Sequence, residues 1–171
     1  MKKIELTQGV CAIVDDCDYE ELRNYKWCAA RSNGDKRCRA VRIGRTPSGK
    51  RRLVFMHRQI LGLTDPRVFT DHVNHNTLDN RRCNIRKCNN AENQCNQLVR
   101  QGGTSRFKGV SWSKQHKNWQ SNIRRNKKAY YLGGYSDELK AARAYDRAAL
   151  IMSGAFAHLN FPKEQYDNEA I

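Results

Sequence analysis

The chain has 171 residues, a net charge of +15 and a sequence pI near 9.8, with 39% hydrophobic residues and a mean hydropathy of −0.88. This length suits one or two small domains, and the excess of Lys and Arg favours a polyanionic partner, nucleic acid before an anionic membrane. No apolar run approaches the ~20 residues of a transmembrane helix, and the N-terminus lacks the apolar stretch and cleavage site of a signal peptide. We therefore expect a cytoplasmic location and no membrane partner.

Residues 1–55 are predicted to form short strands, because β-rich runs alternate with Gly-containing turn signals. The spacing of Asp18 and Glu21 resembles a capping box, which predicts a short helix over residues 18–25. The basic loop at residues 44–52 has two interpretations, a contact to phosphate or an ordinary solvated hairpin. The β-rich runs lie at residues 4–6, 10–14, 27–30, 38–43 and 51–55.

The most polar segment is residues 71–97, where Asp71 directly precedes His72 and asparagines recur at short spacing. One hard divalent cation, Mg²⁺ or Mn²⁺, would explain the carboxylate and amide oxygens. His72 titrates near neutral pH, as a general base should. The alternative is an Asn/Asp-rich turn region, which uses the same residue types for backbone reasons.

The elements expected around this segment are a hairpin and a following helix. Residues 56–61 suit a short helix, and the Asp-His pair would end a strand. Residues 83–86 would begin the returning strand, and Asn89 or Asn90 would cap the next helix.

Seven cysteines form an odd set, which argues against a disulfide framework in a cytosolic protein. No Cys-x₂-Cys pair is present. Cys83, Cys88 and Cys95 crowd the polar segment. A structural zinc site there is one interpretation, and small packing residues are the favoured one.

The polar segment also has a recognisable order of residues. After the Asp71-His72 pair, asparagines follow thirteen and twenty-two residues beyond the aspartate, at Asn84 and Asn93. This order resembles the HNH nuclease motif of phage homing endonucleases over residues 55–98, which implies a ββα-metal (His-Me finger) fold. In that family reading, His72 would be the general base and Asn84 would fix its orientation. Asp71 and Asn93 would hold Mg²⁺ or Mn²⁺, although the motif usually ends in histidine rather than asparagine.

Residues 99–105 are predicted to be a linker, and residues 106–162 a second basic domain. Three strands are expected within residues 106–135, followed by a helix that Ser136 caps and Gly154 ends. Aromatic and cationic side chains alternate along the strands, which suits a DNA groove but also a core with solvated charges. The helix should bury one apolar stripe, formed by Leu139, Ala142, Tyr145, Ala149 and Met152.

Five short blocks in this domain resemble the plant ethylene-response-factor, or APETALA-type, DNA-binding domain over residues 105–162: FKGVSW, WQSNIR, YYLGGY, AARAYDRAAL and LNFP. The resemblance implies a three-stranded sheet that reads the major groove. Ser111 and Ser113 stand where plant members have arginines, and Asn122 where they have glutamate, so the plant target sequence does not transfer. The resemblance and the aromatic and cationic pattern together predict DNA contacts by Lys108, Gly109, Trp112, Lys114, Trp119, Arg124, Arg125 and Tyr131.

The predicted fold class is α+β. A ββα-metal nuclease domain would occupy residues 1–98, with a β-rich extension over residues 1–55. The linker at residues 99–105 would join it to a three-stranded antiparallel sheet packed on one helix, residues 106–162. Residues 163–171 would form a tail.

The predicted function is that of a site-specific DNA endonuclease of the homing type, a metal-dependent hydrolase acting on phosphodiester bonds. The alternative is a sequence-specific DNA-binding regulator with an inactive nuclease scaffold, and an RNA-binding protein is a further rival. The expected partner is double-stranded DNA, without a small-molecule cofactor, in the host cytoplasm if the chain is phage-encoded. Monomer and dimer are both left open.

Overall fold

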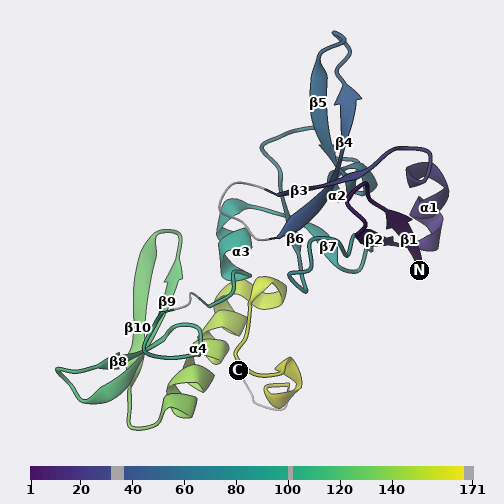
Figure 1. Cartoon of the computed structure of the whole chain (residues 1–171). Helices are drawn as coiled ribbons and strands as arrows, with labels where there is room; N and C mark the ends of the chain where they lie inside the picture. The colour runs from purple at the N-terminus through teal and green to yellow at the C-terminus, as the bar shows by residue number, and fades with distance from the viewer. Residues whose placement is uncertain (32–36, 100–101, 168–171) are drawn as a thin grey trace. The chain divides into compact units, whose positions relative to one another are not determined.

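The structure is a computed structural model that describes residues 1–31, 37–99 and 102–167. The chain divides into two compact units, Met1–Asn89 and Asn90–Ile171 (Figure 1). The named strands of both units pair in antiparallel fashion. Each unit combines such sheets with helices, whereas the ββα-metal arrangement of residues 55–98 stays a prediction.

The first unit consists, in its described residues, of small sheets and two short helices. Its elements are β1 (Lys2–Glu5), β2 (Cys11–Val14), α1 (Asp16–Leu22), β3 (Cys28–Arg31), β4 (Cys38–Arg45), β5 (Arg51–Phe55), α2 (Met56–Ile60), β6 (Phe69–His72) and β7 (Ile85–Cys88). The sheets are β1–β2, β3–β4–β5 and β6–β7. The strands expected in residues 1–55 therefore form. Helix α1 begins earlier than the Asp18 capping box predicts, and Asp15 precedes it without a side-chain capping bond.

The core of the first unit lies between the β1–β2 sheet, α1, α2 and the base of the β3–β4–β5 sheet. Trp27 is 1% exposed, and its indole nitrogen donates a hydrogen bond of 2.8 Å to the Leu22 carbonyl at the end of α1. A buried aromatic residue of this size removes about 150–250 Å² from water. Ile85 extends the same core to β7. The core thereby anchors both the β4–β5 hairpin and the loop between β6 and β7.

The second unit is a three-stranded sheet covered by one long helix. Its elements are α3 (Asn90–Cys95), β8 (Val110–Ser113), β9 (Asn118–Arg125), β10 (Lys128–Tyr135), α4 (Glu138–Ser153), and the 3-10 turns η1 (Gly154–Phe156) and η2 (Lys163–Gln165). The strand order is β10–β9–β8, and α4 lies along this sheet (Figure 1). The three strands and the helix agree with the elements expected for residues 106–162.

Small side chains bring α4 close to the sheet. Ala141 and Ala142 pack with Val110 of β8, while Ala149 and Tyr145 pack with Ile123 of β9. Because alanine adds little bulk beyond Cβ, the helix axis can approach the strands closely.

Two details of α4 differ from the expectation. Leu139 is 46% exposed, and the buried face turns through Ala141 and Asp146 instead. Asp137, not Ser136, caps the helix, because its Oδ1 accepts a bond of 2.7 Å from the Leu139 amide. Gly154 does follow the last residue of the helix, with φ at 50°, as expected of a helix stop.

The division between the units falls between Asn89 and Asn90, so α3 belongs to the second unit rather than to the expected domain of residues 1–98. Hydrogen bonds from the sheet and from α4 hold the end of α3 there. The Lys108 ammonium donates to the carbonyls of Cys95 and Gln97, at 2.5 and 2.7 Å, and the Ser153 hydroxyl donates to the Cys95 sulfur at 3.2 Å.

The predicted linker and tail are only partly described. Residues 100–101 of the linker and 168–171 of the tail lie outside the described residues. The start of the tail is ordered, because Tyr166 is 2% exposed and packs on α4 through a hydrogen bond to Asp146. None of the helices in the described ranges has the length and apolar character needed to cross a membrane. The cytoplasmic location stays a prediction.

Candidate nucleic-acid interface

Strand β9 has two chemically distinct faces. Ser121 and Ile123 are buried beneath α4, since successive side chains of a strand point to opposite sides. Gln120, Asn122 and Arg124 therefore lie on the face away from α4, which we call the outer face. Among the described residues, no hydrogen bond or ion pair engages the side chains of these three residues. The outer face thus presents two amides and one guanidinium that are available to a ligand.

The neighbouring strands extend the outer face. Ser111 of β8 pairs with Gln120, and Tyr131 of β10 pairs with Asn122. Tyr131 is 61% exposed, as the prediction of a DNA contact requires. A register shift follows Tyr131, so that Gly133 lies opposite Ser121. Such bulges increase the local twist of a sheet, which curves the surface on which Tyr131 stands.

The two tryptophans are divided between core and surface. Trp112 and Trp119 are paired across β8 and β9, with ring centroids 5.2 Å apart in an edge-to-face arrangement. Trp119 packs against the cluster of Val110, Ala141 and Ala142, on the α4 side. Trp112 is 39% exposed. The structure therefore places Trp119 in the core rather than on the outer face, and Trp112, its cross-strand partner on the same side of the sheet, stays partly accessible.

Arg125 also points toward α4. Its guanidinium donates to the Ser153 hydroxyl at 2.5 Å and to the Cys95 sulfur at 3.8 Å. This position follows from the alternation along β9, in which Arg125 shares the side of Ile123. Arg124 is exposed on the opposite side. Lys114 lies just beyond the end of β8 and is exposed.

Lys108 and Gly109 pack against the helices of the second unit, Gly109 against Tyr145 of α4 and Lys108 against the end of α3. Gly109 has φ at 76°, and a Cβ at this position would lie 2.0 Å from the Tyr145 ring, so only glycine fits. Burial lowers the pKa of Lys108 to about 8, and its ammonium is used by the end of α3. The structure places both residues in supporting positions and not on the outer face, contrary to the contact positions predicted for them.

Asp146 is a residue of structural importance that the sequence analysis missed. It is fully buried on α4 and accepts hydrogen bonds from the backbone amides of Asn160 and Phe161 and from the Tyr166 hydroxyl, each near 3 Å. Burial raises the pKa of the Asp146 carboxyl, against the effect of these donors. An acidic residue in a helix with alanines gives no local signal of such a role.

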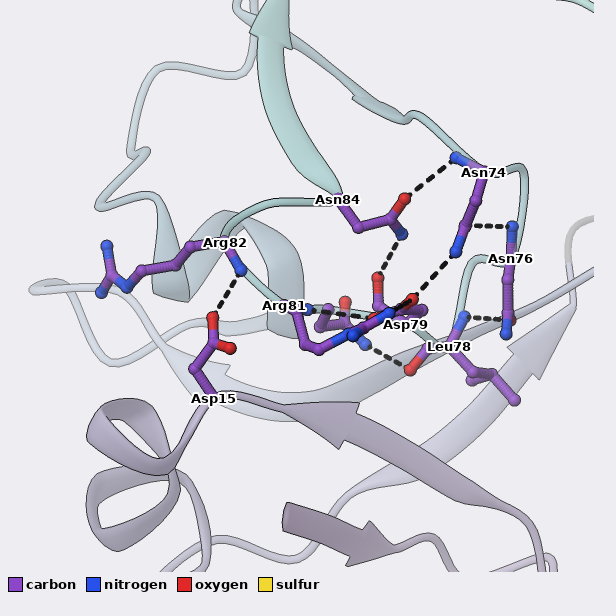
Figure 2. A network of polar contacts seen from close by, with 9 residues as sticks. Asp15, Asn74, Asn76, Leu78, Asp79, Arg81, Arg82 and Asn84 are labelled. Carbon is purple, nitrogen blue, oxygen red and sulfur yellow. Dashed lines mark hydrogen bonds and ion pairs between the residues drawn. The ribbon is translucent and has the colours of Figure 1, made fainter. Parts of the chain in front are cut away.

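The loop between β6 and β7 closes on itself through polar side chains (Figure 2). Oδ1 of Asn84 accepts from the Asn74 amide at 2.9 Å, and Nδ2 of Asn84 donates to the Asp79 carbonyl at 2.7 Å. Asp79 is 2% exposed and pairs with Arg81 at 2.7 Å, while the Asn74 side chain donates to the same carboxylate. Both ends of the Asn84 amide are thereby occupied by the loop, whereas the prediction assigned them to orienting His72.

The Asp71-His72 pair ends β6, as expected, and both residues are buried. The Arg86 guanidinium donates to Oδ2 of Asp71 from two nitrogens, at 2.7 and 3.1 Å. Burial lowers the pKa of His72, although Asn80 and Asp71 oppose this effect. The His57 ring packs edge to face on His72 with centroids 5.0 Å apart, and burial lowers the pKa of His57 to about 3. The sequence analysis did not single out His57.

The predicted metal ligands are divided between the units. Asp71 lies in the first unit and forms the ion pair with Arg86, whereas Asn93 lies on α3 of the second unit. In the part of the chain that the structure describes, no group of three or more His, Cys, Asp or Glu residues is placed to hold a metal ion. Cys83 is exposed, Cys88 is buried, and none of the seven cysteines, all in described residues, forms a disulfide. The donor set is therefore not assembled within the first unit, and the Mg²⁺ site stays a prediction.

Comparisons with known proteins concern about 40% of the chain. The chain is 44% identical over 71 residues to the AP2-like ethylene-responsive transcription factor PLT2 of Arabidopsis thaliana, which covers 40% of this chain and 12% of that protein. It is 38% identical over 66 residues to the APETALA2-like protein 2 of Oryza sativa subsp. indica, covering 39% of this chain and 15% of that protein. A third relative, the AP2-like ethylene-responsive transcription factor At2g41710 of Arabidopsis thaliana, is 39% identical over 72 residues, 42% of this chain and 16% of its own length. No family model matches the chain.

These relatives overturn the prediction of an enzyme. They are transcription factors or APETALA2-like proteins by name, and nothing found in the comparisons supports an HNH endonuclease, a magnesium-dependent hydrolase or a phage origin. The residues that suggested a nuclease have structural partners in the first unit, since Asp71 pairs with Arg86 and Asn84 closes the β6–β7 loop. The Asn/Asp-rich turn, which was the alternative interpretation of this segment, accounts for these contacts. The matched part of this chain is similar to AP2-like transcription factors, which supports an AP2-type DNA-binding domain.

Proposed function

We propose that the chain is a sequence-specific regulator that binds double-stranded DNA through the outer face of the β8–β9–β10 sheet. The observation that carries this proposal is the row of Gln120, Asn122 and Arg124 at every second position of β9, on the side away from α4. The similarity to transcription factors of the AP2-like type supports the same partner. The net charge of +15 favours a polyanion, because neutralised phosphates release their counterions.

The spacing of this row suits a base-edge reader. Two residues along a strand advance about 6.6 Å, which is about twice the ~3.4 Å rise of one base step. Side chains from a sheet can therefore address every second base pair where the strand follows the groove. Gln and Asn pair with the major-groove edge of adenine, and Arg pairs with that of guanine. The proposed site thus has two adenines and one guanine at alternating positions.

The proposal is tested by selecting duplexes from a random library with the full chain and then measuring the affinity of variants. Arg124→Ala should weaken binding to the selected site by about 1–3 kcal/mol and relax the preference at one base pair. Lys140→Ala is the matched control, because Lys140 is exposed on α4 and its removal changes the net charge equally. If both variants lost the same amount of affinity for the selected duplex, Arg124 would not contact a base edge and the proposed role of the outer face would be refuted. A reporter gene carrying the selected site then tests regulation.

A further inference from the structure

We infer that the β4–β5 hairpin of the first unit is a second DNA-binding element, a two-stranded ribbon that enters the major groove of duplex DNA. This inference goes beyond the function proposed above, because the hairpin lies in the other unit and shares no residue with the β8–β9–β10 sheet. It rests on the charge of the hairpin, on the pairing across one of its faces and on the dimensions of a β-ribbon.

The charged residues of the hairpin all have the same sign. Residues 38–55 hold six Lys or Arg and no Asp or Glu, so this segment has a net charge of +6, compared with +15 for the whole chain. The two strands run antiparallel, and their turn end extends away from α2 and the core of the first unit (Figure 1). A basic projection without acidic residues is suited to a polyanion. The six cations are Arg39, Arg42, Arg45, Lys50, Arg51 and Arg52.

One face of the hairpin combines an apolar pair with a cationic pair. Ile43 lies directly across from Leu53, and these side chains are 63% and 58% exposed. Arg45 lies directly across from Arg51, two residues further toward the turn and therefore on the same face. No ion pair engages either arginine within the described residues. We call these four residues the ribbon face.

Neither pair is fully satisfied in the protein alone. Like charges directly across a ladder repel each other, and the aliphatic pair leaves more than half of each side chain in contact with water. Features that conflict with stability in this way are typical of functional surfaces. Phosphates on both sides of a groove would neutralise Arg45 and Arg51, and thymine methyl groups would cover Ile43 and Leu53.

The opposite face of the hairpin is partly used by the protein itself. Arg42 donates to Gln59 at 3.0 Å and lies over the Tyr25 ring at 4.0 Å. At Gly44, a Cβ would lie 2.8 Å from Val54, so that side of the strand is already filled. Arg52 is paired with Gly44 and belongs to this opposite face. The asymmetry identifies the ribbon face as the binding side.

The dimensions favour B-form DNA over other polyanions. Two paired strands lie about 4.8 Å apart, and the ~12 Å major groove of B-DNA admits such a ribbon. The major groove of A-form RNA is too deep and narrow for side chains to read. An anionic bilayer offers charge and an apolar interior but no groove of defined width, and a vesicle-binding measurement distinguishes it from DNA.

The decisive experiment compares Arg51→Gln with Arg52→Gln in the full chain. The two residues are exposed neighbours that lose the same charge, but they point to opposite faces. Binding to a duplex selected by the wild-type chain is measured across a series of salt concentrations. Arg51→Gln should reduce the slope of log K against log salt by about 0.9, the value for one phosphate contact. Arg52→Gln should leave the slope unchanged. Equal slopes for both variants, reduced or not, would overturn the inference.

The apolar pair is tested by a double variant, Ile43→Ser with Leu53→Ser, on the same duplex. We expect affinity to fall about tenfold or more, the scale on which aliphatic side chains lose their burial, with a wild-type salt slope. Unchanged affinity would overturn the ribbon face as a groove contact. If this variant fails to fold by circular dichroism, the comparison of the two arginine variants still decides.

Three further arms separate this inference from its rivals. Arg124→Ala in the same assay tests the sheet of the second unit. If Arg124→Ala leaves DNA affinity unchanged while Arg51→Gln reduces the salt slope, the inference about the ribbon is supported and the proposed function is refuted. Competition by an RNA duplex as strong as by DNA would overturn entry into a B-form groove. Arg51→Gln and Arg52→Gln should bind to phosphatidylserine vesicles with equal affinity. A loss of vesicle binding confined to Arg51→Gln, with unchanged DNA affinity, would make the partner a membrane and overturn the inference.

Discussion

In the loop between β6 and β7, Asn74, Asp79 and Asn84 bond to one another and to the loop backbone, whereas on β9 the amides of Gln120 and Asn122 face away from α4. The residue types are alike in the two regions. What differs is the backbone, because a closed turn brings donors and acceptors of nearby residues together, while an extended strand separates them onto two faces. Polar composition therefore indicates that hydrogen bonds will be made, and the backbone decides whether they are made internally or to a partner.

The largest effect should come from an internal network in the second unit. Asp146→Ala would leave the partly buried amides of Asn160 and Phe161 and the buried Tyr166 hydroxyl without an acceptor. At about 1–3 kcal/mol for each orphaned donor, the loss should reach roughly 4 kcal/mol in the free energy of unfolding of the second unit. Chemical denaturation measures it. Asp137→Ala, which removes only the cap of α4, should cost about 1 kcal/mol, and similar costs for both variants would refute the role of Asp146.

A substitution in the β6–β7 loop should lower the free energy of unfolding of the first unit by nearly as much. Asp79→Ala removes the acceptor of Arg81 and of the Asn74 side chain, and should destabilise the first unit by about 3 kcal/mol. DNA affinity measured well below the unfolding transition should change little, because the loop bonds internally. A large loss of DNA affinity in the folded variant would place the loop in the binding surface. It would refute the distinction between an internally bonded loop and a binding face on β9.

The pH dependence of stability sharpens the same prediction. The hydrogen bond from Arg81 lowers the pKa of Asp79 below its ordinary value. Because the folded pKa lies below the unfolded one, the stabilisation is fully present above about pH 4 and is lost as the pH falls through the folded pKa. Denaturation curves recorded at descending pH should show this loss in the wild type and a smaller one in Asp79→Ala.

The outer face should behave in the opposite way. Asn122→Ala should leave the unfolding free energy within about 0.5 kcal/mol of the wild-type value, as expected of a partly exposed side chain without internal bonds. Affinity for the selected duplex should fall by about 1–3 kcal/mol, with the preference for adenine relaxed at one position. Titration with duplexes substituted at each position measures both quantities. A destabilised protein with normal DNA affinity would show that Asn122 belongs to the fold.

The smallest effect concerns the ribbon face in the absence of DNA. Arg51→Gln removes the repulsion with Arg45 across the hairpin, and should stabilise the first unit by about 0.2–1 kcal/mol. Thermal unfolding at low salt measures the gain, which should shrink as salt screens the two charges. Destabilisation by this substitution would mean that Arg51 has a favourable contact in the free protein.

Local patterns in the sequence were sufficient to predict most of the helices and strands. The alternation along residues 118–125 places Ser121 and Ile123 on the buried side of β9, and the alanine-rich stretch forms α4 as expected. Glycine at position 154 ends the helix. These features depend on periodicity and on backbone preference, which neighbouring residues determine.

Contacts between distant residues were decided by the tertiary structure alone. Asp146 finds its donors 14 to 20 residues away, Lys108 reaches the end of α3, and Asp71 is neutralised by Arg86 on the adjacent strand. The sequence places carboxylates and amides near one another in the Asp71 segment, and from that order a nuclease was inferred. Whether such a group meets a ligand or another side chain depends on which remote donors the fold brings within hydrogen-bonding distance, and a hydrogen bond between remote segments leaves no periodic trace in the sequence.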